Sequence, residues 1–405
     1  MLNRLSIGFL VLATACTGEL TGGMGDDVVD PPPDQVTITV RDQGVPAPAV
    51  SVVFQAPDGT QIADLKTDGS GTAFAAMPAG GNVSVIRIIG GQQVAYTYVG
   101  VKPLDSLVFG RGTLDNPSEN NVTVNVPPAA GGGPVTISTA CGTGTGQPPQ
   151  IALALTGCAT ELDFFVADQA GNSFLAHAPL AGAVDLSTQA YAPSSVTMLS
   201  VLNVPAGGTT ALEKRLDTPA PFYVFSTGPL ATQTTIEATT PSLPSSEQVY
   251  VVNYTNAASV QMISNRQPFS ATPSSIDVVA NVMRATSATT VDPATGNVSW
   301  TETGDGVLPD HVTARLTVTR PDLTFMRYIV APYAGSLVNL PALPAMYATL
   351  NWTAGDTATA QHALGRATGG YDAIRNRVFA VASTVDAVPM NGTATYSYEA
   401  GTTAP

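Results

Sequence analysis

The chain has 405 residues, of which 11% are charged and 44% hydrophobic, and its formal net charge is −14. This length predicts two or three domains, each large enough to bury a core. Its 38 Gly and 32 Pro would interrupt long helices, so the composition excludes a helical bundle or a coiled coil and favours short strands joined by turns. With 16 basic against 30 acidic residues, the charge balance also excludes a nucleic-acid-binding protein.

Residues 1–15 are predicted to be a signal peptide. Arg4 precedes a short apolar run, Leu5–Leu12, which is too short to cross a bilayer as a helix. The junction Leu12-Ala-Thr-Ala-Cys16 resembles a bacterial lipobox, which implies a diacylated Cys16 as the mature N-terminus. Thr17 follows the cysteine where an Asp would oppose sorting to the outer membrane, so the resemblance implies a lipid-anchored outer-membrane protein, periplasmic or surface-exposed. Plain secretion is the alternative, because Ala13-Thr-Ala15 also suits ordinary signal peptidase.

The cysteine count agrees with lipidation. The chain has three cysteines, and an acylated Cys16 leaves Cys141 and Cys158 as an even pair in an oxidising compartment. We therefore expect these two to form a disulfide. Residues 16–34 are rich in Gly, Pro and acidic residues without periodicity, which predicts a disordered tether.

Residues 35–127 are predicted to form the first β-sandwich. Val36–Val40 alternates apolar and polar residues, as a half-buried strand does, and turn sequences separate the runs that follow. The segment resembles bacterial immunoglobulin-like domains of the invasin and intimin type and the related carboxypeptidase-regulatory fold, which implies a sandwich but no particular function. The matching residues are Val40, Asp42, Gly44, Pro46, Thr67, Asp68 and Gly71.

The remainder is predicted to be all-β as well, giving tandem sandwich domains. Residues 128–134 read as a linker, residues 135–240 as a second sandwich containing the disulfide, and residues 241–405 as a C-terminal β-rich domain. Gly142–Gly146 precedes Pro148-Pro149 and a strand, not a helix, so it predicts a flexible hairpin loop inside the disulfide and not a dinucleotide site. Strands are expected at Val298–Trp300 and Tyr347–Trp352, and short helices at Thr357–Arg366 and Tyr371–Arg377.

Residues able to carry out chemistry are sparse. His177, His311 and His362 lack metal-ligand spacing and are expected to be unrelated surface residues, although a distant trio could converge in space. No Gly-x-Ser-x-Gly motif is present. Most aspartates lie beside Gly or Pro and are expected to cap turns, with calcium ligation or a catalytic carboxylate pair as alternatives. These aspartates include Asp58, Asp68, Asp168, Asp292 and Asp305.

Four aromatic residues could form a sugar-stacking platform: Trp300, Trp352, Tyr347 and Tyr371. Packing in a sandwich core is the competing interpretation of the same residues. Since the chain has three lysines, any ligand should be held by aromatic, amide and hydroxyl groups more than by electrostatic attraction.

The sequence therefore favours a non-catalytic, lipid-anchored outer-membrane protein with no metal or cofactor, acting in adhesion, scaffolding or ligand binding. Its expected partners are the membrane, through the lipid, and an envelope protein or glycan. The alternatives are a carbohydrate-active or other hydrolytic enzyme with its site in residues 241–405, and a periplasmic assembly lipoprotein.

Overall fold

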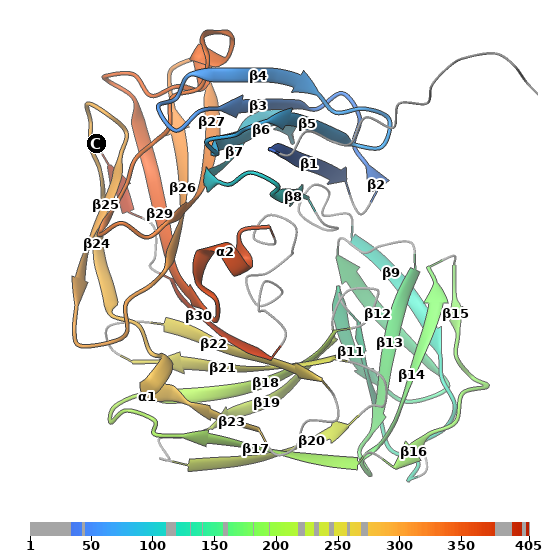
Figure 1. Cartoon of the computed structure of the whole chain (residues 1–405). Helices are drawn as coiled ribbons and strands as arrows, with labels where there is room; N and C mark the ends of the chain where they lie inside the picture. The colour runs from blue at the N-terminus through green and yellow to red at the C-terminus, as the bar shows by residue number, and fades with distance from the viewer. Residues whose placement is uncertain are drawn as a thin grey trace, which may run out of the picture. The chain divides into compact units, whose positions relative to one another are not determined.

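The computed structural model describes residues 34–42, 45–110, 119–129, 131–139, 141–156, 161–180, 182–193, 195–217, 223–230, 235–242, 247–256, 260–268, 274–376, 391–398 and 402–404 (Figure 1). The signal peptide, Cys16, Cys158 and all of the predicted tether except Asp34 lie outside these residues. Within them the fold is all-β, and four hydrophobic cores are found between facing sheets.

The first core lies in an N-terminal β-sandwich, where the sequence places one. Strand β1 buries Val36, Ile38 and Val40 and leaves the residues between them partly exposed, because successive strand residues point to opposite faces. One sheet contains β1 (Gln35–Asp42), β2 (Val45–Pro46), β5 (Thr72–Ala76) and β8 (Ser106–Phe109). The facing strands are β3 (Ser51–Gln55), β4 (Gln61–Lys66), β6 (Gly81–Ile89) and β7 (Gln92–Val101).

The second core crosses the predicted boundary at residues 127 and 128. Strand β9 (Glu119–Asn125) pairs with β12 (Gln150–Thr156) along its whole length, and Ala129 of the predicted linker packs into the same core. The Pro- and Gly-rich segment is thus a connection inside one sandwich, which composition alone does not distinguish from a linker between domains. The other strands are β10 (Val135–Thr139), β11 (Gly142–Gly146), β13 (Glu161–Asp168), β14 (Asn172–Pro179), β15 (Val184–Asp185) and β16 (Ala192–Pro193).

The glycine-rich segment Gly142–Gly146 is a strand, not the loop that the sequence predicts. It pairs with β10, and its three glycines face β12 at very close range. A Cβ atom on Gly142 would lie 2.4 Å from the carbonyl oxygen of Ala154, and one on Gly144 would lie 2.7 Å from Leu153. Glycine at every second position therefore serves a close approach between two strands and not flexibility.

The third core crosses the predicted boundary at residue 240. Strand β20 (Thr235–Ser242) spans that position and pairs with β17 (Ser195–Leu202), which also pairs with β23 (Ser274–Asp277). Pro241 is tolerated because β20 is an edge strand of this sheet. The facing elements are β18 (Thr209–Asp217), β19 (Tyr223–Leu230), β21 (Glu247–Thr255), β22 (Val260–Pro268) and the short helix α1 (Val278–Asn281).

The fourth core lies in the C-terminal part. The sheet β24 (Ala285–Val291), β25 (Val298–Thr303) and β28 (Leu337–Val338) faces β26 (His311–Thr319), β27 (Thr324–Pro332) and β29 (Thr357–Ala367). The expected helix over Thr357–Arg366 is wrong: strand β29 lies there and pairs with β26, and Ala358, Ala360 and His362 are buried while Thr359 and Gln361 between them are exposed. The expected strand at Tyr347–Trp352 is also wrong: a 3-10 helix, η2 (Ala345–Leu350), lies there. Helix α2 (Gly370–Ile374) forms where a helix was expected.

One continuous sheet links three of these cores. Twelve of its thirteen strands follow the order β19-β18-β21-β22-β30-β29-β26-β27-β7-β6-β3-β4, where β30 is Gly392–Tyr398, and the thirteenth, β31 (Thr402–Ala404), pairs with β29. The join between the N-terminal and C-terminal parts is the parallel pair β7–β27, with Phe325 to Val330 in register with Gln93 to Tyr98. The sandwiches therefore share a sheet instead of standing as separate tandem domains.

Helix α2 fastens the same two parts together. The Tyr371 hydroxyl donates to the carbonyl of Val99 at 2.8 Å and to that of Val330 at 3.3 Å, which links β7 to β27. Arg375 forms a two-pronged ion pair with Asp105, at 2.8 Å for each nitrogen. No helix among the described residues is long and apolar enough to cross a membrane.

Candidate functional site

Two of the four aromatic residues proposed as a platform lie in hydrophobic cores. Trp300 is 5% exposed and stacks on the His362 ring, with centroids 4.7 Å apart. Tyr371 is 7% exposed, and its hydroxyl is occupied by backbone carbonyls. Core packing, the competing interpretation, holds for both residues, because a buried ring cannot present its face to a ligand.

The other two aromatics lie at the margin of the C-terminal core, in different settings. Trp352 packs over Gly296, and its indole nitrogen donates to the carbonyl of Pro293 at 3.1 Å. Tyr347, on η2, is partly exposed and lines a groove. The structure therefore does not assemble the four into one platform, and Tyr347 is the member that reaches a candidate site.

The histidines differ from the expectation of three surface residues. His177 is half-exposed and lies 2.9 Å from Asp163 and 3.3 Å from Glu161, and hydrogen bonds to these two carboxylates raise its pKa above 6.5. His311 and His362 are buried on neighbouring strands. His311 is held by Asp310 at 2.5 Å, and His362 by Thr289 at 2.9 Å. Both buried rings pack against aromatic residues of the core, His362 on Trp300 and His311 on Tyr396.

Four of the five aspartates near Gly and Pro cap turns, as the sequence predicts: Asp58, Asp68, Asp168 and Asp292. Asp68 accepts from the backbone amides of Ser70 and Thr72, each at 2.9 Å, and its pKa is lowered by hydrogen bonds to Ser70 and Thr72. Asp168 makes the equivalent bonds to the amides of Ala170 and Asn172. Across the residues that the structure describes, no three His, Cys, Asp or Glu side chains form a group suited to a metal ion.

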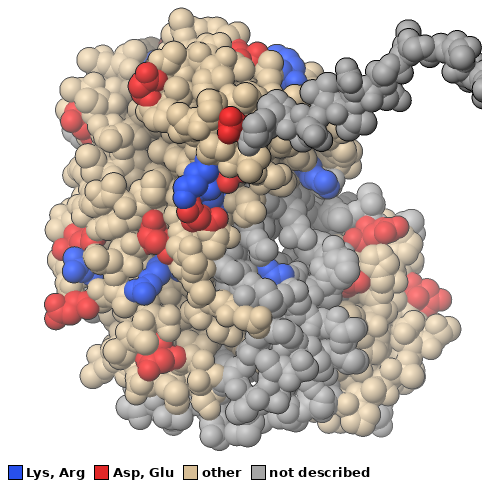
Figure 2. All heavy atoms as spheres, in the orientation of Figure 1, with Lys and Arg blue, Asp and Glu red and all other residues tan. Residues whose placement is uncertain are grey.

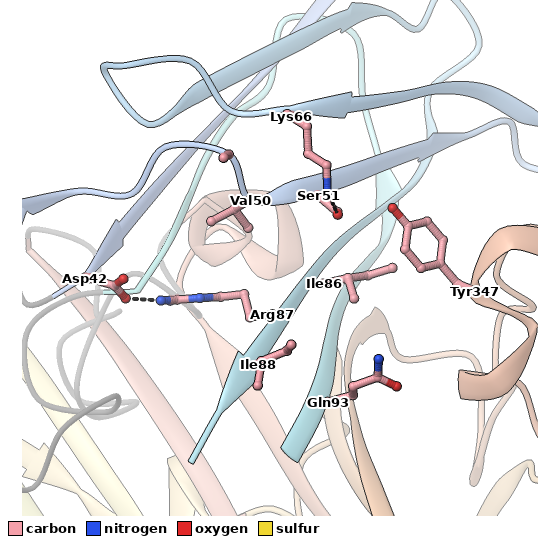
Figure 3. Close-up of a pocket in the computed structure, with 10 residues that line it drawn as sticks. Asp42, Val50, Ser51, Lys66, Ile86, Arg87, Ile88, Gln93 and Tyr347 are labelled. Atoms are coloured by element: carbon pink, nitrogen blue, oxygen red, sulfur yellow. Dashed lines mark hydrogen bonds and ion pairs between the residues drawn. The ribbon is translucent and has the colours of Figure 1, made fainter. Parts of the chain in front are cut away.

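A groove of about 440 Å³ lies on the outer face of the N-terminal sheet, beside Tyr347 (Figure 3). Strands β3, β4, β6 and β7 form its floor, and η2 contributes one wall. The lining combines polar and apolar side chains: Asp42, Ala49, Val50, Ser51, Lys66, Ile86, Arg87, Ile88, Gln93 and Tyr347. A cavity of this size falls in the range that holds small ligands.

Two hydrogen bonds hold polar side chains of the groove lining. The Lys66 ammonium donates to the Ser51 hydroxyl across the strand pair β3–β4, where the two residues are in register. The Tyr347 hydroxyl donates to Asp64 at 3.1 Å. Burial and the Asp64 carboxylate raise the pKa of Tyr347 above 10, while a hydrogen bond with Ser51 opposes the rise. The polar groups are therefore preorganised by one another before any ligand arrives.

Buried side chains hold the wall of the groove that carries Tyr347 through hydrogen bonds to its backbone. Arg327 is fully buried and donates to the carbonyls of Leu350 at 3.1 Å and Pro341 at 2.8 Å. Burial lowers the pKa of Arg327 to about 10. Gln55 adds a bond to the carbonyl of Ala342 at 2.9 Å. Because these bonds hold the backbone on both sides of Tyr347, its ring has a fixed place at the groove.

Sequence reasoning missed the groove except for Tyr347. Ser51 and Lys66 are 15 residues apart, and Tyr347 follows Asp64 by 283 residues, so no local spacing links them. The available signal was that Lys66 is one of only three lysines in an acidic chain. That signal does not indicate which partners meet the lysine.

Comparison with known proteins leaves the family open. No protein-family model matches the chain, and no curated protein matches it. Among solved structures, the Bacillus anthracis TIE protein matches with 12% sequence identity and a TM-score of 0.16, over 60% of this chain and 49% of that one. The match thus spans about half the length of that protein. A superposition of this quality supports no conclusion about the fold or the function of this chain.

Proposed function

We propose that the chain is a non-catalytic, lipid-anchored outer-membrane protein that binds a small ligand in the groove beside Tyr347. The observation that carries the proposal is the lining: hydroxyl, amide and ammonium groups converge with apolar side chains in one cavity of about 440 Å³. Such a mixture fixes a ligand's orientation through its polar groups while its apolar surface is buried. The ligand is a glycan or another component of the cell envelope.

The charge distribution supports a small ligand more than a polyanion. The formal net charge of −14 repels anionic polymers at long range. Figure 2 shows the charged side chains of one face as scattered spots, with most of the coloured atoms belonging to isolated residues or to pairs of opposite sign. Recognition in the groove therefore depends on short-range contacts.

The anchor is tested at the mature N-terminus. Mass spectrometry of protein from membranes should find a diacylglyceryl group on Cys16, and Cys16→Ser should release the protein from the membrane fraction. An unmodified Cys16 peptide in the culture medium would show that the protein is secreted without an anchor.

The binding site is tested by filling it. Gln93→Trp places a large ring in the groove, and the full chain carrying it should lose binding to arrays of envelope glycans. Gln361→Trp is the matched control, because Gln361 is exposed on β29 of the same sheet and does not line the groove. Equal binding by wild type and Gln93→Trp would place the binding site elsewhere.

One observation favours the alternative of a hydrolytic enzyme. Serine with lysine as its base is a known nucleophilic pair, and Lys66 contacts Ser51 here, outside the C-terminal region where the sequence placed an enzyme site. Against it, Ser51 is 8% exposed and its hydroxyl already accepts a hydrogen bond from Lys66. Labelling by a fluorophosphonate probe that disappears in Ser51→Ala would favour the enzyme, and we expect no labelling of either protein.

A further inference from the structure

Lys66 brings a positive charge to the groove that the described residues do not neutralise. Its side chain is exposed and donates to the neutral Ser51 hydroxyl, and no carboxylate among the described residues forms an ion pair with it. An ammonium has three donors, so two remain for a ligand. The contrast is Lys102, which is paired with Asp372.

Two acidic residues lie near Lys66, and neither forms an ion pair with it. Asp42 is paired with Arg87, as the dashed line in Figure 3 marks. Asp64 accepts the hydroxyl hydrogen of Tyr347 through one oxygen and keeps its negative charge, and its other oxygen is buried. Arg87 is therefore balanced within the protein, which leaves Lys66 as the cation available to an incoming anion. One ammonium matches a singly charged carboxylate better than a doubly charged phosphate.

The rest of the groove suits the body of a sugar. Ile88 is 72% exposed, and with Ile86 and the Tyr347 ring it offers an apolar surface beside the polar groups. Figure 3 shows Gln93 next to Ile86 and across the groove from Lys66. An amide both donates and accepts hydrogen bonds, as adjacent sugar hydroxyls require. The C–H face of a pyranose would lie on the apolar surface.

We propose that the groove binds a carboxylate-bearing sugar unit, a hexuronate, with its carboxylate on Lys66 and its hydroxyls on Gln93. This inference rests on the proposed function and adds the charge and class of the ligand. It makes Lys66 the residue that distinguishes acidic from neutral sugars.

The test is a titration of the full chain with methyl glucuronide and with methyl glucoside. Ligand-observed NMR measures the affinity for each glycoside. Wild type should bind the glucuronide about tenfold more tightly, as expected for hydrogen bonds to a charged group. Lys66→Met should bring the two affinities together. Lys102→Met, which removes the same charge outside the groove, should leave the ratio unchanged.

The outcomes separate this inference from the proposed function. Equal affinity for both glycosides, with binding lost in Gln93→Trp, would overturn the acidic-sugar inference and leave the groove as a binding site. Displacement of the glucuronide by millimolar acetate would show that the carboxylate alone is recognised, which also overturns it. No binding of either glycoside overturns it as well, and glycan-array binding by the Gln93→Trp and Gln361→Trp proteins then decides whether the groove binds another ligand.

Discussion

At the scale of single residues, charged groups are buried where they hold backbone in place. Arg320 donates to Asp356 at 2.6 and 2.8 Å and also reaches the carbonyls of Thr349 and Asn351. Asp356 in turn accepts from the amide of Thr353 at 2.8 Å. This network fixes the chain directly after η2, which carries Tyr347.

Asp356→Asn should destabilise the fold by about 3 kcal/mol, because it leaves Arg320 partly buried without its counter-ion. The Arg320 guanidinium holds the pKa of Asp356 below 3.8. A lowered pKa means that this contribution is present above pH 3.8 and is lost as the pH falls through the folded-state value. Urea unfolding at several pH values measures it, with exposed Asp322→Asn as the control. A similar loss in both variants would contradict the account.

The pKa of His177 is shifted upward, whereas that of Asp356 is shifted downward. Its pKa is raised by Asp163 and Glu161, so NMR should find it above 6.5, and Asp163→Asn should move it back toward that value. A raised pKa stabilises the fold below pH 6.5, and this contribution is lost as the pH rises through the folded-state value. The effect on stability should be small, because the side chain is 53% exposed. An unchanged pKa in Asp163→Asn would assign the shift to another cause.

At the scale of elements, glycine and threonine alternate along β11. The glycines lie on the face that packs against β12, and the threonines lie on the exposed face. Gly142→Ala should destabilise by about 1–3 kcal/mol, because the new methyl group would meet the Ala154 carbonyl. Thr143→Ala, on the exposed face of the same strand, should change stability by less than about 1 kcal/mol. Denaturant unfolding of the two variants tests this contrast. Equal effects would mean that β11 does not approach β12 as described.

The disulfide that the sequence predicts joins Cys141 to Cys158. Cys141 directly precedes β11, and Cys158 lies outside the described residues, so the Cys141–Cys158 pairing stays a prediction. Cross-linking should stabilise the fold by about 3 kcal/mol, on the chain-entropy model. Thiol labelling without reductant should modify neither residue in the native protein. Ready labelling of both would contradict the pairing.

The elements also show what local sequence could and could not predict. Val36, Ile38 and Val40 predict β1 because the alternation of apolar and polar residues in a half-buried strand is visible in the local sequence alone. The predictions for Gly142–Gly146 and Thr357–Arg366 are wrong because glycine and alanine suit several local structures, and close packing against neighbouring strands decides between them. The segment from Pro127 to Pro134 resembles a linker in composition. It lies inside a sandwich because β9, which precedes it, pairs with β12, which follows it.

At the scale of the whole molecule, long-range strand pairing places the candidate site. Tyr347 lines the same groove as Ser51 and Lys66 because β7 and β27 pair in parallel, which brings the C-terminal region to the outer face of the N-terminal sheet. Parallel pairing between strands more than 200 residues apart leaves no local signature. The all-β class followed from composition and alternation, whereas the groove required the tertiary structure.

The central claim is that the groove holds its ligand without transforming it. The direct measurement is mass spectrometry of a glycan captured by the full chain, eluted after prolonged incubation and compared with the free glycan. We predict capture that is lost in Gln93→Trp, retained in Gln361→Trp, and followed by elution of a ligand of unchanged mass. A ligand cleaved by wild type but left intact by Ser51→Ala, or full capture by Gln93→Trp, would contradict the account.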